Sequence, residues 1–263
     1  MLFLDRREAG QRLAVVVKER GLASPVVLGI PGGGVPVAIE VARAIGGEAG
    51  VVVARKLGAP ANPELAIGAT TSTGVTYMNT AVAAAAGADE RYIATERERQ
   101  VREARRREKL FDSHRRPRVE GRAVVVVDDG LATGATAIAA VRAMKAAAAA
   151  RVVLAVPVGP PQIVDLLRLE ADEVICLYED PGLWAVGQFY VDFDPLSDAE
   201  VREMLDAYAA TLAAADPGGR VEFERSEVPL AGTARRHRAR RRSTVRLAPH
   251  SAGQAPKREE RSR

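Results

Sequence analysis

The chain has 263 residues, 47% of them hydrophobic, which is enough to bury one substantial core with a small appendage. Charged residues follow a very short apolar patch at the N-terminus, and no apolar run approaches the roughly 20 residues of a membrane span. We therefore expect neither a signal peptide nor a membrane anchor. The single cysteine, Cys176, excludes a disulfide within the chain, and this composition predicts a cytoplasmic protein.

The net charge of +4 conceals a strong asymmetry. From residue 219 to the end there are twelve Arg and one Lys against five Glu, a balance of +8, so the preceding residues carry −4. Hydrophobic periodicity also fails after residue 216. We therefore expect a folded domain over residues 1–216 and a basic, disordered tail over 217–263, which could contact nucleic acid without sequence specificity.

Apolar strands alternate with amphipathic helices along the first 216 residues. In chain order we expect a helix over 5–20, a strand over 26–30, a helix over 35–45, a strand over 51–55, a loop or hairpin over 57–79, a helix over 89–113, a strand over 124–127, a helix over 135–145, a strand over 151–158, a helix over 161–169, a strand over 173–178 and a helix over 198–215. This alternation predicts the α/β class, with a doubly wound, mainly parallel sheet flanked by helices.

The most informative segment runs from Val124 to Thr136. Four valines predict a fully buried parallel strand, and Asp128 and Asp129 follow at its carboxyl end, where open α/β sheets place their ligands. A turn of small residues then opens into a helix. Backbone N–H groups at such a turn bind phosphate, and the hydroxyls of Thr133 and Thr136 add donors. The segment therefore predicts a site for a sugar phosphate.

Simpler interpretations of this segment are an ordinary Asp-Asp-Gly turn and an ordinary Thr-Gly-Ala-Thr helix start. A Walker loop is excluded because Ala135 stands where its lysine would be. The glycine-rich segment 29–34 contains a proline and lacks the dinucleotide-binding spacing. The strand, the acid pair and the Thr-Gly-x-Thr turn together resemble the 5-phosphoribosyl-1-pyrophosphate (PRPP) signature of type I phosphoribosyltransferases, and the chain is most similar to bacterial members whose acceptor is not evident.

The resemblance implies a role for each part of the site. Asp128 and Asp129 would bind the ribose hydroxyls and stabilise positive charge developing on the ring. The 5′-phosphate would be held by Gly130, Ala132, Thr133, Gly134, Ala135 and Thr136. Pyrophosphate would be bound by the glycine loop, Pro31, Gly32, Gly33 and Gly34, and by Arg55 and Lys56, expected at the end of the second strand. Mg²⁺ would be held mainly by PRPP oxygens and water, with Asp128 and Asp129 as further candidate ligands.

Two other segments would complete the site. Residues 57–79 correspond to a mobile loop that closes over the substrate, although a static hairpin is an equal alternative. Glu64 is the carboxylate of that segment and a candidate for proton transfer. A small hood would come from the N-terminus and residues 180–194, including Trp184, Phe189 and Tyr190. Trp184 and Phe189 would stack on a planar acceptor or simply pack against other apolar side chains.

One position departs from the family pattern. Enzymes that act on hypoxanthine or guanine carry an aspartate just before the Thr-Gly, where this chain has Ala132, so the turn resembles the adenine type. We expect a Mg²⁺-dependent transferase, by resemblance a homodimer, that moves the phosphoribosyl group to a nucleobase-like nitrogen and inverts the anomeric carbon. The alternative is a non-catalytic PRPP-sensing regulator that binds nucleic acid.

Overall fold

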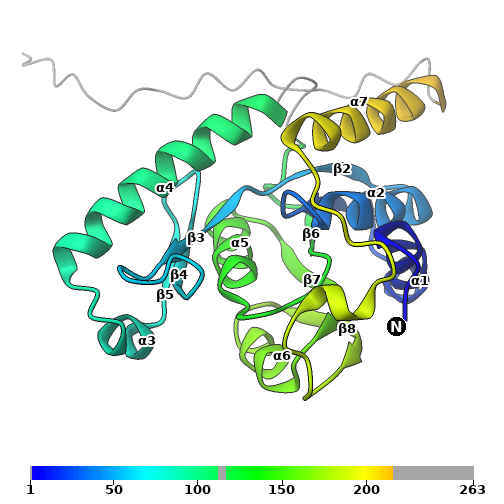
Figure 1. The fold of residues 1–263 in the computed structure, drawn as a ribbon. Coiled ribbons are helices and arrows are strands. Elements are labelled where there is room, and N and C mark those ends of the chain that lie inside the picture. The colour runs from blue at the N-terminus through cyan, green and yellow to red at the C-terminus, as the bar shows by residue number, and fades with distance from the viewer. Residues whose placement is uncertain (1, 112–116, 216–263) are drawn as a thin grey trace, which may run out of the picture. The chain divides into compact units, whose positions relative to one another are not determined.

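The computed structural model describes residues 2–111 and 117–215. A five-stranded parallel sheet has the order β2-β1-β6-β7-β8, and a separate three-stranded antiparallel sheet has the order β3-β4-β5 (Figure 1). The elements are α1 (Arg6–Lys18), β1 (Val26–Gly29), α2 (Gly34–Ile45), β2 (Glu48–Val51), β3 (Ala54–Gly58), β4 (Ala66–Thr71), β5 (Thr76–Met78), α3 (Thr80–Ala85), α4 (Glu90–Phe111), β6 (Ala123–Val127), α5 (Ala135–Ala146), β7 (Arg151–Gly159), α6 (Pro161–Arg168), β8 (Glu173–Glu179), η2 (Val186–Phe189) and α7 (Asp198–Ala215).

Both faces of the parallel sheet are covered by helices, which confirms the predicted fold class. Side chains alternate along a strand, so Val125 and Val127 of β6 pack in one cluster with α1, α2 and α7. Val124 and Val126 pack in a second cluster with α5 and α6. All four valines have no exposed surface. A run that is apolar at every position is therefore what a central strand between two helical layers requires.

The predicted strand over 51–55 is wrong, because two strands belonging to different sheets meet there. Val52 donates its N–H to the Gly29 carbonyl as the chain leaves the parallel sheet. β3 then begins at Ala54 and pairs antiparallel with β4. The apolar run over residues 51–54 spans the junction between the two strands, and sequence periodicity does not identify a change of partner strand. α3 was likewise not predicted.

The small antiparallel sheet takes up most of the segment predicted as a mobile loop or hairpin. The turn between β4 and β5 is held by α4: Arg105 donates to the Ser72 carbonyl, and Arg97 donates to the Gly74 carbonyl. β4 also packs on α5 through Ala69 and Ala139. These contacts describe an ordered hairpin, and the closing motion stays a prediction.

The N-terminus and the segment predicted as a hood lie against each other. Phe3 and Tyr190 form a parallel bridge, and Val191 and Asp192 donate their N–H groups to the carbonyls of Phe3 and Leu4. Phe3, Phe189 and Tyr190 pack in a common cluster. The predicted basic tail lies outside the described residues, as does its expected contact with nucleic acid. Of the helices that the structure describes, none is long and apolar enough to cross a membrane.

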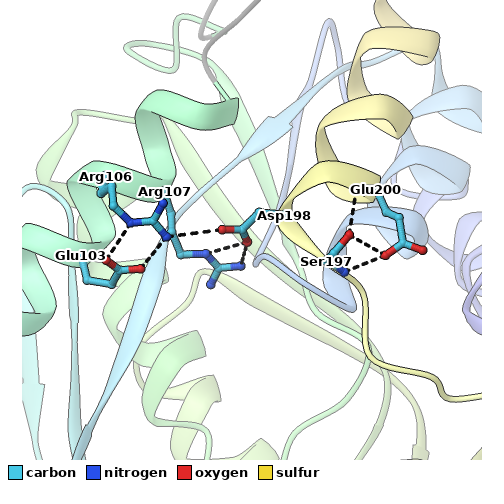
Figure 2. A network of polar contacts seen from close by, with 6 residues as sticks. All are labelled: Glu103, Arg106, Arg107, Ser197, Asp198 and Glu200. Atoms are coloured by element: carbon cyan, nitrogen blue, oxygen red, sulfur yellow. Dashed lines mark hydrogen bonds and ion pairs between the residues drawn. The ribbon is translucent and has the colours of Figure 1, made fainter.

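A charged network joins α4 to the start of α7 (Figure 2). The Arg107 guanidinium donates from Nε to Asp198 Oδ1 over 2.9 Å, and Arg106 bridges Glu103 and Asp198. Arg107 retains 14% of its side-chain exposure and Asp198 28%. Ser197 and Glu200 exchange hydrogen bonds in the same turn, which caps α7. This network fixes α7 beside the long helix.

We expect Asp198→Ala to lower the free energy of unfolding by about 1–2 kcal/mol, because it leaves the poorly exposed Arg107 without its carboxylate. The matched control is Glu98→Ala on α4, whose pair with Arg102 spans 3.9 Å with both side chains over 70% exposed. Such a pair contributes roughly 0.5 kcal/mol or less. Urea unfolding followed by circular dichroism measures both, and equal effects would contradict the structural role of the network.

Candidate functional site

A pocket of about 160 Å³ lies at the carboxyl end of β6. It is bounded by the turn that follows this strand, by two residues of the antiparallel sheet and by one residue of η2. The lining residues are Lys56, Ala66, Asp128, Gly130, Leu131, Ala132, Thr133, Gly134, Ala135, Thr136 and Val186. The structure thus brings together Asp128, Lys56 and every residue predicted to hold the 5′-phosphate.

The turn over 130–134 is shaped by its small residues. Gly134 has a φ of +71°, in the left-handed region, and directly precedes α5. No side chain caps this helix. The first N–H groups of α5 therefore point out of the helix without a side-chain acceptor, beside Thr133 and Thr136. This arrangement can bind an anion of the size of a phosphate group.

The two carboxylates of the signature face different surroundings. Asp128 lines the pocket, and its Oδ1 accepts the N–H of Asp129 over 3.0 Å. Asp129 instead accepts, at Oδ2, a hydrogen bond from Nε of Arg6 over 2.8 Å. Burial, with the adjacent charge of Asp129, raises the pKa of Asp128 well above its ordinary value of 3.8. Burial also raises the pKa of Asp129, and the Arg6 guanidinium opposes that rise.

Arg6 was not predicted as a site residue. Its Nη1 donates to the Asp194 carbonyl over 2.9 Å, and its guanidinium lies 3.9 Å from the centre of the Phe193 ring. It contacts Asp129 across 123 positions of sequence, a pairing that no local spacing predicts. One signal was available: a cation in the first turn of a helix opposes the helix dipole, so its presence there calls for an anionic partner elsewhere.

The glycine loop packs against the acid pair. A Cβ built on Gly33 would lie 1.6 Å from Asp129 Oδ2 and 2.6 Å from Arg6 Nε. A Cβ on Gly34 would lie 2.6 Å from the Val127 carbonyl. The peptide between Pro31 and Gly32 is cis. The loop does not line the pocket, but Gly33 and Gly34 pack directly against the carboxylates that follow β6.

Arg55 and Lys56 do not end a strand of the parallel sheet, which corrects the prediction. They are consecutive residues of β3, so their side chains point to opposite faces. Lys56 lines the pocket, and its Nζ donates to Glu64 Oε2 over 2.8 Å. Arg55 donates to Gln100 of α4 over 2.8 Å, and its burial lowers its pKa. The structure therefore places Lys56, but not Arg55, beside the turn over residues 130–134, the predicted phosphate turn.

Glu64 does not line the pocket, but its carboxylate is hydrogen-bonded to Lys56, which does. The Lys56 hydrogen bond lowers the pKa of Glu64, whose side chain is 90% exposed. A carboxylate held in its ionised form is a weak proton acceptor near neutral pH. These surroundings do not favour the proton-transfer role predicted for Glu64.

The three predicted hood aromatics have different environments. Trp184 is 83% exposed, whereas Phe189 and Tyr190 are buried in the cluster around Phe3. Tyr190 donates its hydroxyl to the Asp129 carbonyl over 2.7 Å, and burial raises the pKa of that phenol, which keeps its proton. Phe189 thus follows the packing alternative, and Tyr190, in the same cluster, binds the backbone of the acid pair.

The donors around the pocket bear on the predicted magnesium ion. Within residues 2–111 and 117–215, no group of three or more His, Cys, Asp or Glu side chains is arranged to hold a metal. Asp128 at the pocket wall supplies hard oxygen donors, which Mg²⁺ prefers. This donor set fits an ion whose remaining ligands are substrate oxygens and water.

Known proteins resemble this chain over most of its described length. The family model described as "Phosphoribosyl transferase domain" matches residues 8–193. Two Mycobacterium tuberculosis proteins, named "Putative phosphoribosyl transferase MT0597" (strain CDC 1551) and "Putative phosphoribosyl transferase Rv0571c" (strain H37Rv), are each 43% identical over 242 residues. Each alignment covers 88% of this chain but 55% of the relative, so the chain spans about half the length of these curated proteins.

A solved structure extends the comparison. The protein TT1426 from Thermus thermophilus is 42% identical to this chain, with a TM-score of 0.67. The match covers 79% of this chain and 99% of TT1426. This chain therefore resembles TT1426 in both sequence and fold over most of the residues that the structure describes.

We expect Gly33→Ala to destabilise the protein, because the new methyl group would overlap Asp129 and Arg6 and separate the ion pair. Gly32→Ala is the matched control in the same loop, since its Cβ would lie no closer than 3.5 Å to the Leu196 carbonyl. A loss of roughly 2 kcal/mol or more is expected for Gly33→Ala. Thermal unfolding of both variants is the measurement. A smaller loss for Gly33→Ala than for Gly32→Ala would contradict this packing.

Asp128→Asn should stabilise the unliganded protein, and the gain should grow with pH. Because the folded-state pKa of Asp128 is raised, the stability linked to this group is present below its ordinary pKa and is lost as the pH rises through the folded-state value. Asparagine removes that loss. Melting temperatures of variant and wild type should differ little near about pH 4 and by several degrees near about pH 8. Asp165→Asn, an exposed change on α6, is the control and should show no such trend.

Proposed function

Because this chain belongs to the phosphoribosyl transferase domain family, we propose that it transfers the 5-phosphoribosyl group between PRPP and an acceptor, with pyrophosphate as the leaving group. The observation that carries the proposal is the convergence of four features in one pocket: an acid, a threonine turn, an uncapped helix N-terminus and a lysine. Each of them can bind either a phosphate group or a sugar hydroxyl. The proposal concerns the domain that this chain contains.

The 5′-phosphate of PRPP would occupy the turn that precedes α5. Gly130, Ala132, Thr133, Gly134, Ala135 and Thr136 would surround the 5′-phosphate. Backbone N–H groups and the positive end of α5 would bind its oxygens, and the two threonine hydroxyls would add hydrogen bonds. These contacts do not change during transfer, so they orient the ribose for reaction at C1.

The carboxylates would act on the ribose. Asp128 and Asp129 would accept hydrogen bonds from the ring hydroxyls and offset the positive charge that develops as the bond from C1 to pyrophosphate breaks. The new bond from C1 to the acceptor nitrogen would form on the opposite face, which inverts the anomeric carbon. Bound Mg²⁺ would neutralise the charge of the leaving pyrophosphate.

The leaving group would be bound by the glycine loop, Pro31, Gly32, Gly33 and Gly34, and by Lys56. The lysine at the pocket wall supplies a mobile positive charge, and the glycines allow close backbone approach. Arg55 would not belong to this set, because its guanidinium is directed to Gln100. Glu64 would not act as the general base, since its carboxylate is paired with Lys56.

The acceptor would be a nitrogen nucleophile other than a 6-oxopurine. Ala132, which lines the pocket, has no group to bind the base where hypoxanthine and guanine enzymes carry an aspartate. The exposed Trp184 lies in the hood segment and offers a face for a planar acceptor. Adenine and related bases are therefore the first candidates.

Isothermal titration with PRPP and Mg²⁺ tests the proposal. Wild type should bind, and Asp128→Asn should bind about tenfold or more weakly, because a charged hydrogen bond to ribose is lost. Asp165→Asn is the surface control. Pyrophosphate release measured over a panel of bases would identify the acceptor. The absence of PRPP binding would refute the proposal, and binding without turnover on any base would favour a non-catalytic sensor.

A further inference from the structure

Arg6 makes three contacts, which reach two separate parts of the chain: Asp129 after β6, and the consecutive residues Phe193 and Asp194. Its Nε donates to Asp129 Oδ2, its Nη1 donates to the Asp194 carbonyl, and its guanidinium stacks on Phe193. Its side chain retains 12% of its exposure, and that of Asp129 retains 14%. A planar guanidinium is the group that can donate in two directions while it stacks.

The contacts of Arg6 meet around the acid that follows Asp128. The Asp129 carboxylate is held by Arg6, its carbonyl accepts from Tyr190, and its N–H donates to Asp128 Oδ1. Gly33 packs directly on the ion pair. A shift of the Asp129 side chain would therefore reach the glycine loop, and a shift of its backbone would reach Asp128 in the pocket wall.

The attachment of α1 does not depend on Arg6. Asp5 caps the helix by accepting the Glu8 N–H over 2.7 Å, and a buried apolar face that includes Leu13 and Val17 packs in the cluster shared with α2. A cation at the first position of the helix opposes its dipole. The contacts of Arg6 thus serve the acid pair rather than the placement of the helix.

We propose that Arg6 is a positioning residue of the ribose site: it fixes the orientation of the Asp129 carboxylate and holds the glycine loop and residues 193–194 around the acid pair. This inference rests on the proposed function, because the acid pair binds ribose hydroxyls only if the pocket binds PRPP. Arg6 acts through Asp129 and does not itself line the pocket.

The test compares two probes and two backgrounds. Arg6→Met should lower the affinity for PRPP with Mg²⁺ about tenfold, as expected for a carboxylate that loses a charged hydrogen bond and its orientation. The affinity for inorganic phosphate, followed by phosphorus NMR, should stay within about twofold, because the phosphate turn does not contact Arg6. In an Asp129→Ala background, Arg6→Met should change PRPP affinity by no more than about twofold.

Arg7→Met is the matched control on the same helix, since Arg7 is 70% exposed and meets Glu40 at 3.5 Å. It should leave the affinity for both probes unchanged. Arg6→Lys retains the charge but not the planar donor geometry, and should lose PRPP affinity severalfold with phosphate binding intact; this variant decides the question if Arg6→Met does not fold.

Three outcomes would overturn the positioning role: unchanged PRPP affinity, an equal loss for both probes, or an undiminished effect in the Asp129→Ala background. A wild-type protein that binds no PRPP would instead refute the proposed function, and the positioning role with it. The two failures are separate because the first appears only in the variants.

Discussion

Two adjacent carboxylates at the end of a central strand impose the main constraint on this structure. Asp128 and Asp129 follow four fully buried valines, where burial raises the pKa of both and the charge of Asp129 adds to the rise for Asp128. Arg6 offsets the cost of this burial, because its guanidinium forms an ion pair with the Asp129 carboxylate. The hydroxyl of Tyr190 and the absence of a side chain at Gly33 complete the surroundings of the pair.

That constraint connects regions that are far apart in the sequence. The N-terminal segment pairs with residues 189–192. This pairing accompanies the contact of the Tyr190 hydroxyl with the Asp129 carbonyl, while α1 brings Arg6 to the Asp129 carboxylate. Tyr190 and Phe193 stack with ring centres 4.8 Å apart, so the aromatic residues form a continuous support for the guanidinium. The buried aromatics of the hood segment therefore organise the carboxylates rather than forming an open surface for a base.

The opposite side of the pocket is made by the antiparallel sheet. Lys56 of β3 and Ala66 of β4 face the phosphate turn, and the same sheet is tied to α4 through its arginines. α4 is in turn joined to α7 by the pairs of Arg107 and Arg106 with Asp198. The lysine that would bind the leaving group thus belongs to a different sheet from the strand that carries the acid pair.

The sequence by itself determined four of the five parallel strands, most of the helices and the turn of small residues before α5, because these depend on local signals: the buried valine run, the small residues of the turn and the period of each helix. It could not determine where Arg55 and Lys56 would point, since one apolar run over residues 51–54 hides the change from the parallel sheet to the antiparallel sheet. Nor could it connect Arg6 with Asp129, or separate the buried Tyr190 from the exposed Trp184. Only the tertiary structure decided these, because long-range pairs and the burial of an aromatic ring depend on which surfaces the fold brings into contact.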